Sequence, residues 1–192
     1  MTRRSLCQTL AGNNCDMLMI TSPTEETQPF NKRKGIVLTA RVHPGESNSS
    51  WMMKGIIDYL TGTSLDAKIL RDNFVFKIVP MLNPDGVISG NYRCSLSGED
   101  LNRRWIDPDV RMYPTIWHVK RVIQQLQLER DVILFCDLHG HSKKKNIFMY
   151  GCSDNSSTPR RIITRIFPRI LWKTSQNFSF QDCSFAMQKS KE

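Results

Sequence analysis

The chain has 192 residues, of which 40% are hydrophobic, an ordinary composition for one globular domain with a buried core. Its formal charge of +9 favours acidic partners without choosing among nucleic acid, an acidic membrane surface and an acidic peptide. No apolar run approaches the roughly 18 residues of a membrane span, and residues 1–8 lack the apolar stretch of a secretory signal. We therefore expect a soluble, intracellular protein, whose six cysteines, without a Cys-x-x-Cys spacing, are reduced thiols.

The first half of the chain predicts strands alternating with helices. Two strands, at 6–10 and 17–21, flank a turn-rich spacer, and a polar connector leads to a third strand at 36–41. Apolar residues at helical spacing predict a helix over 47–60 and a short one over 66–71. A run rich in β-branched and aromatic residues then predicts a strand at 74–79.

The second half continues this alternation. We expect a helix over 113–128, a buried strand over 132–138, another strand at 147–150 and a basic helix within 159–192 that Pro168 interrupts. The pattern predicts an α/β fold with a mixed, largely parallel central sheet, flanked by helices, whose ligands gather at the strand ends. No repeat or second domain is evident, so we predict a single domain over 1–192.

Three side chains predict a metal site. His43 and Glu46 lie on a turn directly after one predicted strand, and His139 directly follows another. Pro44 and Gly45 suit a tight turn that lets the first two side chains converge. Two imidazole nitrogens and one carboxylate, with a fourth position open for water, are typical of catalytic zinc. Although a His-x-x-Glu spacing alone is a weak signal, the whole arrangement predicts one Zn²⁺ per chain.

Some residues allow plainer interpretations. His141 is a rival third ligand, although we prefer His139, and His118 is most simply a surface or packing histidine within a helix. The segment Asn83-Pro84-Asp85-Gly86 consists of turn formers, so it is either merely a turn or also functional. Arg104 is left out of the core site, because solvated arginine is the commoner outcome.

Five short motifs in a fixed order resemble the cytosolic carboxypeptidases, a family of M14-like zinc metallocarboxypeptidases, and within it the branch of cytosolic carboxypeptidases 2 and 3. The resemblance covers nearly the whole chain. The motifs are His43-Pro44-Gly45-Glu46, Asn83-Pro84-Asp85-Gly86-Val87, Asn91-Tyr92-Arg93-Cys94-Ser95, Asp100-Leu101-Asn102-Arg103 and His139-Gly140-His141-Ser142.

The resemblance implies a zinc carboxypeptidase fold and the same three zinc ligands. It also implies that Arg93, Asn102 and Arg103 surround the terminal carboxylate of the substrate. A guanidinium fork beside an amide suits this task, because it gives charge-assisted, bidentate hydrogen bonds to a free carboxylate. Asp100 matches the position that orients a zinc-bound histidine, which we assign provisionally to His43.

The resemblance further implies a general-base glutamate and a tyrosine downstream of the third ligand. After His139 the carboxylates are Asp154, Asp182 and Glu192, and none stands in the matching context. A positioned general base typically contributes about 10²- to 10⁴-fold in rate. We therefore expect a truncated form of low or no activity, an incomplete catalytic domain that also lacks the β-sandwich domain preceding it in full-length relatives.

The leading hypothesis is a zinc metallocarboxypeptidase that removes glutamates from polyglutamate side chains or acidic C-termini, with tubulin as the target that the resemblance implies. It predicts a cytosolic protein associated with microtubules, centrioles or basal bodies, without nucleic-acid or membrane partners and with an open oligomeric state. The basic residues at 143–145 and 160–173 are then a solvated face. A non-catalytic module that binds acidic tails and an aspartoacylase-like small-molecule amidohydrolase are the alternatives.

Overall fold

The computed structural model describes residues 1–152 and 158–186, apart from the side chains of 158–160. The chain divides into two compact units, Met1–Gly140 and His141–Glu192, and each is described by itself. Among the described residues, no helix has both the length and the apolarity needed to cross a bilayer.

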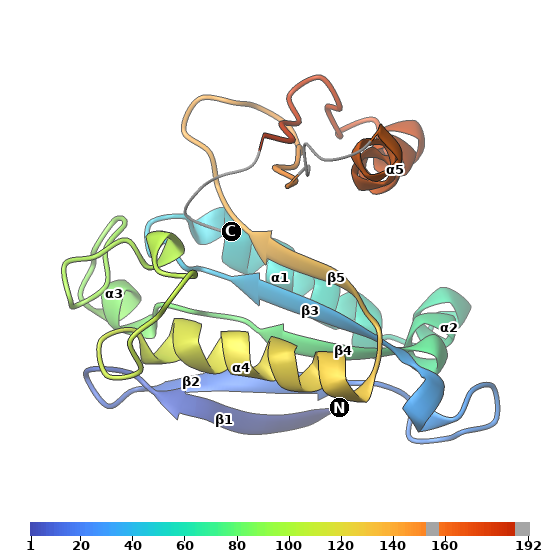
Figure 1. Ribbon diagram of the computed structural model, residues 1–192, viewed down its shortest axis with the longest axis horizontal. Helices are drawn as coiled ribbons and strands as arrows, with labels where there is room; N and C mark the ends of the chain where they lie inside the picture. The colour runs from blue at the N-terminus through green and yellow to red at the C-terminus, as the bar shows by residue number, and fades with distance from the viewer. Residues whose placement is uncertain (153–157, 187–192) are drawn as a thin grey trace. The chain divides into compact units, whose positions relative to one another are not determined.

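The first unit is built on a five-stranded sheet in the order β1-β2-β4-β3-β5 (Figure 1). Its strands are β1 (Thr2–Gln8), β2 (Asn14–Ile20), β3 (Lys34–Ala40), β4 (Phe74–Val79) and β5 (Val132–Leu138). The pairings β1/β2 and β2/β4 are antiparallel, whereas β4/β3 and β3/β5 are parallel. The predicted mixed sheet is confirmed, with parallel pairing confined to β4, β3 and β5. The carboxyl ends of these three strands lie at one edge of the sheet, where ligands gather in α/β folds.

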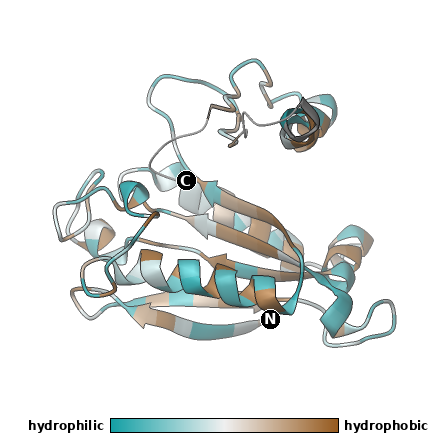
Figure 2. Cartoon of the chain, in the orientation of Figure 1, coloured by the Kyte–Doolittle hydropathy of each residue, from teal (hydrophilic) through white to brown (hydrophobic). Residues whose placement is uncertain are grey.

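Helices flank this sheet on both faces. Figure 1 shows α4 (Pro114–Glu129) in front of the sheet and α1 (Ser47–Thr61) behind it, with α2 (Leu65–Asn73) on the same side as α1. Strand β3 is buried from Gly35 to Ala40, which is why its sequence is a continuous apolar run rather than an alternating one. Figure 2 shows the same hydrophobic character along the central strands.

Two hydrophobic clusters fill the space between sheet and helices. The cluster under α4 comprises Cys15, Met17, Val42, Val79, Leu82, Leu101, Ile116 and Val119. The cluster under α1 and α2 comprises Ile20, Ile36, Leu38, Ala40, Met53, Leu60, Phe76 and Ile78. Alternate residues of β2 and β4 belong to different clusters, because successive side chains of a strand point to opposite faces.

Three short helices shape the loops around the sheet: η1 (Phe30–Lys32), α3 (Pro84–Ile88) and η2 (Leu101–Arg103). Asn83 begins α3 by accepting a hydrogen bond from the Gly86 backbone N–H, 3.0 Å from its Oδ1, and Pro84 occupies the first turn. Asp100 caps η2 in the same way through the Asn102 N–H. The segment of turn formers at 83–86 is therefore the start of a helix rather than only a turn.

The second unit departs from two predictions. Helix α5 (Thr158–Thr174) continues through Pro168 instead of being interrupted there. Proline removes one backbone hydrogen bond, but the helical bonds on either side are enough to carry the helix past it. The predicted strand at 147–150 is also wrong, because this segment forms only isolated bridges, from Ile147 to Phe178 and from Tyr150 to Ser184.

Candidate metal centre

His43 and Glu46 lie on the tight turn that joins β3 to α1. The Arg41 side chain braces this turn by donating from Nε to the Pro44 carbonyl at 2.7 Å. Gly45 donates its N–H to the Tyr92 carbonyl at 2.7 Å, and a Cβ at this position would overlap the Tyr92 ring. Only glycine allows this close approach, so the turn and the loop that carries Tyr92 are held together.

His139 reaches the same point because β5 lies beside β3. Ala40 and Leu138 are partners in the parallel register, so the residues just beyond each strand end emerge next to each other. The rings of His43 and His139 have centroids 5.1 Å apart. Two segments distant in the sequence thus deliver their imidazoles to one edge of the sheet.

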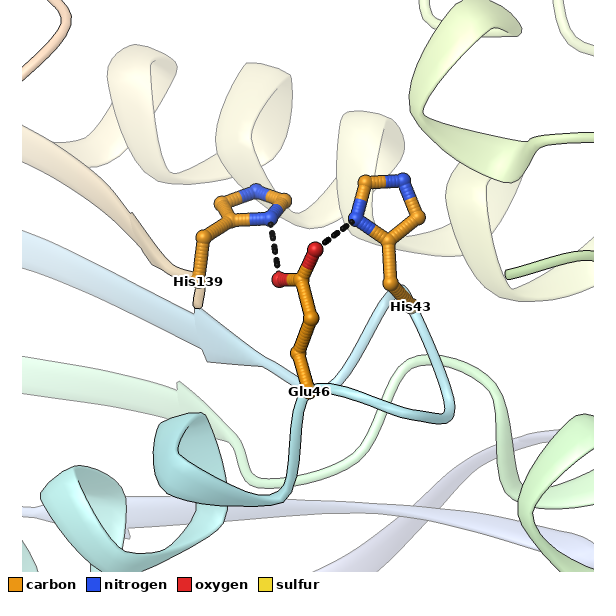
Figure 3. A group of neighbouring side chains, drawn as sticks. All are labelled: His43, Glu46 and His139. Atoms are coloured by element: carbon orange, nitrogen blue, oxygen red, sulfur yellow. Dashed lines mark hydrogen bonds and ion pairs between the residues drawn. The ribbon is translucent and has the colours of Figure 1, made fainter. Parts of the chain in front are cut away.

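Figure 3 shows the Glu46 carboxylate between the two imidazole rings. The distance from His43 Nδ1 to Glu46 Oε1 is 2.9 Å, and the distance from His139 Nδ1 to Glu46 Oε2 is 3.1 Å. The Gly140 N–H also donates to Oε2 at 2.7 Å. One ligand atom from each of the three residues lies within 4.8 Å of the others, and together they form a group that could hold a metal ion.

A second carboxylate holds the far nitrogen of each ring. His43 Nε2 lies 2.9 Å from Asp100 Oδ1, which is the contact expected for Asp100. His139 Nε2 lies 2.6 Å from Asp137 Oδ2, a partner that the sequence analysis missed. The signal was available, because Asp137 stands two residues before His139 at the end of a strand, where such side chains share a face.

The charged groups in this cluster shift one another's pKa values toward the charged forms. Burial works against the charged form of Glu46, but hydrogen bonds with His139 and His43 outweigh it and lower the pKa of this carboxyl group. Burial also lowers the pKa of His139, whereas the Asp137 and Glu46 carboxylates raise it, and the net pKa is about 9. For Asp100, burial is likewise outweighed by the hydrogen bond with His43, so its pKa is lowered.

The cluster fits zinc by the chemistry of its donors. Both nitrogens of each ring face a carboxylate oxygen, and Asp100 and Asp137 can accept hydrogen bonds from the Nε2–H groups while the Nδ1 atoms of His43 and His139 face Glu46. The two Nδ1 atoms and the Glu46 carboxylate would then hold a divalent cation, because metal ligation requires neutral imidazole. Two nitrogens and one carboxylate are a common zinc donor set.

The three residues expected around a substrate carboxylate lie in different settings. Arg93 is half-exposed and pairs with Asp100, with Nη2 2.8 Å from Oδ2, so Asp100 joins this arginine to His43. Asn102 is buried, and its Oδ1 accepts from the Trp105 indole at 3.1 Å. Arg103 is exposed, and its Nη1 donates to the Asn102 carbonyl at 3.3 Å.

The remaining candidates have other surroundings. His141 Nδ1 accepts the backbone N–H groups of Lys143 and Lys144, at 3.1 and 2.9 Å. His118, on α4, packs against the Trp117 ring. Arg104 pairs with Glu99 at 2.6 Å. Asp154 and Glu192 lie outside the described residues, and Asp182 belongs to the second unit.

Comparison with known proteins agrees with this site. The zinc carboxypeptidase family (peptidase M14) matches residues 1–184, so the chain belongs to the zinc carboxypeptidase family. It is 54% identical over 190 residues to cytosolic carboxypeptidase 2 of Xenopus tropicalis, a match that covers 98% of this chain and 20% of that protein. It is 55% identical over 191 residues to cytosolic carboxypeptidase 3 of Bos taurus, covering 98% of this chain and 19% of that protein. The predicted resemblance to this branch is confirmed, and the chain spans about a fifth of these relatives' length.

Solved structures show the same fold. A metallo-carboxypeptidase from Burkholderia cenocepacia is 28% identical with a TM-score of 0.83, over 99% of this chain and 49% of that one. A metallo-carboxypeptidase from Pseudomonas aeruginosa, in complex with (2-guanidinoethylmercapto)succinic acid, is 25% identical with a TM-score of 0.79, over 99% of this chain and 49% of that one.

Proposed function

We propose that this chain carries the metal-binding part of a zinc metallocarboxypeptidase that removes glutamates from polyglutamate side chains or acidic C-termini, with tubulin as a target. The cluster of His43, Glu46 and His139 carries this proposal, because Asp100 links it to a guanidinium suited to a terminal carboxylate. The proposed place of action is the cytosol, at microtubules, centrioles or basal bodies.

Each group of residues would have its own role. His43, Glu46 and His139 would hold the ion, which would polarise the scissile carbonyl and lower the pKa of a bound water. Asp100 and Asp137 orient the two rings through Nε2. Arg93 binds the free carboxylate of the substrate, and this preference for a chain end makes the enzyme an exopeptidase.

Charge supports an acidic substrate. The formal charge of +9 attracts a polyglutamate chain at long range, and the half-exposed Arg93 gives it a specific contact. The net charge and the Arg93 guanidinium together favour acidic substrates over neutral ones.

A non-catalytic module that holds zinc and acidic tails is the second candidate. In the described part of the first unit, the carboxylates in contact with the two histidines are Glu46, Asp100 and Asp137, and each is already engaged by an imidazole. If this candidate is right, the chain binds zinc and acidic tails but releases little glutamate.

Two measurements on the purified chain test these proposals: zinc content, and glutamate release from a polyglutamylated peptide with and without a chelator. Zinc with chelator-sensitive release supports the peptidase, and zinc without release selects the binding module. Release from N-acyl aspartate but not from peptides would select the amidohydrolase. In a matched pair, His139→Ala should abolish zinc binding while His118→Ala retains it, and loss in both variants would contradict the assigned site.

A further inference from the structure

Cys7 on β1 and Cys15 on β2 stand directly opposite each other in the antiparallel register of the first hairpin. The pairing is irregular between Ser5 and Cys7, and beyond that point both cysteines pack at the cluster under α4. Directly opposed residues have Cα atoms about 4.5–5.5 Å apart. This lies within the roughly 4.4–6.8 Å that a disulfide spans, so the backbone already has the required spacing.

The two thiols differ in environment. Cys15 Sγ donates to the Met81 carbonyl at 3.5 Å. Cys15 is only 1% exposed, whereas Cys7 is half-buried on a strand at the end of the described sheet. The neighbouring Cys15 thiol lowers the pKa of Cys7, whereas the Cys7 thiol together with burial raises the pKa of Cys15. Cys7 is therefore the more reactive and more accessible partner.

We propose that Cys7 and Cys15 form a thiol modification site that oxidised glutathione, or a similar small disulfide, converts reversibly to a cross-strand disulfide. Cys7 loses its proton and its sulfur attacks one sulfur of glutathione disulfide, which breaks that S–S bond and releases one glutathione thiol. Cys15 then loses its proton and attacks the Cys7 sulfur of the mixed disulfide, which releases the second thiol. The two protons end on the two glutathione thiols, and the protein gains one disulfide while the glutathione disulfide is reduced.

The site lies at the base of the hairpin turn at residues 9–13. Within that turn, Thr9 Oγ1, the Ala11 N–H and Asn13 Nδ2 all donate to the buried Asp85 carboxylate. Oxidation ties together the two strands that carry this turn and restricts the unfolded chain. A disulfide here raises the midpoint of thermal unfolding and slows amide exchange in the turn.

The test is oxidation of the purified chain with glutathione disulfide, followed by peptide mapping without reductant. The expected product joins the peptides that contain Cys7 and Cys15, is lighter by a pair of hydrogen atoms, and disappears on treatment with dithiothreitol. The thermal midpoint rises with the same dose and returns on reduction. Glutathione remaining on Cys7 without transfer to Cys15, or no modification at either residue, would overturn the proposal.

Variants separate the two roles. Cys15→Val, an apolar replacement suited to a buried strand, should leave a stable glutathione adduct on Cys7, and Cys7→Ser should leave Cys15 unmodified. The control is Cys152→Ser, which removes an exposed thiol and should oxidise at the hairpin like the parent chain. If Cys15→Val does not fold, Cys7→Ser still decides, because glutathione on Cys15 in that variant would refute the assigned order of attack.

Discussion

Thr39 on β3 donates a hydrogen bond to Asp137 on β5, with 2.7 Å between Thr39 Oγ1 and Asp137 Oδ1. The two residues are partners in the parallel register, and the other oxygen of Asp137 lies 2.6 Å from His139 Nε2. A contact between neighbouring strands therefore fixes a carboxylate, which in turn orients the ring of a candidate zinc ligand. Pairing in the sheet is in this way coupled directly to the geometry of the site.

Asp137→Asn should weaken zinc binding by about 10- to 100-fold, the usual cost of losing the partner that orients a metal-bound histidine. Competition with a chromophoric chelator measures the change. The matched control is Asp131→Asn, an exposed residue just before the same strand, which should bind zinc like the parent. Equal affinity of both variants would contradict an orienting role for Asp137.

Gly86→Ala should destabilise the fold. A Cβ at Gly86 would overlap the Pro44 ring and lie 2.8 Å from Asn83 Oδ1 and 2.9 Å from the Cys94 carbonyl, so α3 would be pushed off the turn that carries His43. We expect a loss of about 1–3 kcal/mol in the free energy of unfolding, as for other overpacked sites, measured by urea denaturation.

Gly55→Ala is the control for this change, because a Cβ there meets nothing within 4 Å and the residue lies inside α1. Alanine in the interior of a helix should stabilise by roughly 0.5–1 kcal/mol relative to glycine. A loss of stability at both positions would show that the space around Gly86 is not the cause.

Asp85→Asn should loosen the hairpin turn from α3. Its carboxylate accepts three hydrogen bonds while only 5% exposed, and an amide leaves some of those donors without an acceptor. The expected cost is about 1–3 kcal/mol in the free energy of unfolding. Asp58→Asn, which breaks only an exposed pair with Lys54, should cost roughly 0–1 kcal/mol. Comparable losses in the two variants would refute a structural role for Asp85.

Affinity for a polyglutamate peptide should fall steadily as salt is added. The Debye screening length falls from about 10 Å at 0.1 M to about 3 Å at 1 M ionic strength. A long-range attraction that depends on the net charge therefore weakens across that range. Fluorescence anisotropy of a labelled peptide gives the affinity at each salt concentration, and a peptide with glutamine in place of glutamate is the control. A flat salt dependence would remove electrostatic steering from the proposed function.

The local sequence pattern was enough to predict the strands and helices that bury apolar side chains. The strands expected at 74–79 and 132–138 are β4 and β5 to the residue, because each is a compact run of β-branched and aromatic residues between turn signals. The helix expected over 47–60 is α1 extended by one residue. Two predictions failed because tertiary context decides the outcome. The apolar run at 147–150 forms only isolated bridges instead of a strand. Helix α5 continues through Pro168 because the helical bonds on either side persist.

The sequence by itself determined the family, the alternation of strands and helices, and the types of residue at the candidate metal centre, because short motifs and hydrophobic periodicity are local properties of the chain. Only the tertiary structure decided that Glu46 lies between two imidazoles, that Thr39 holds the Asp137 carboxylate, and that Cys7 faces Cys15. These relationships depend on which strands are neighbours and in what register, and register is set by which face of each strand is buried and by the geometry of the turns.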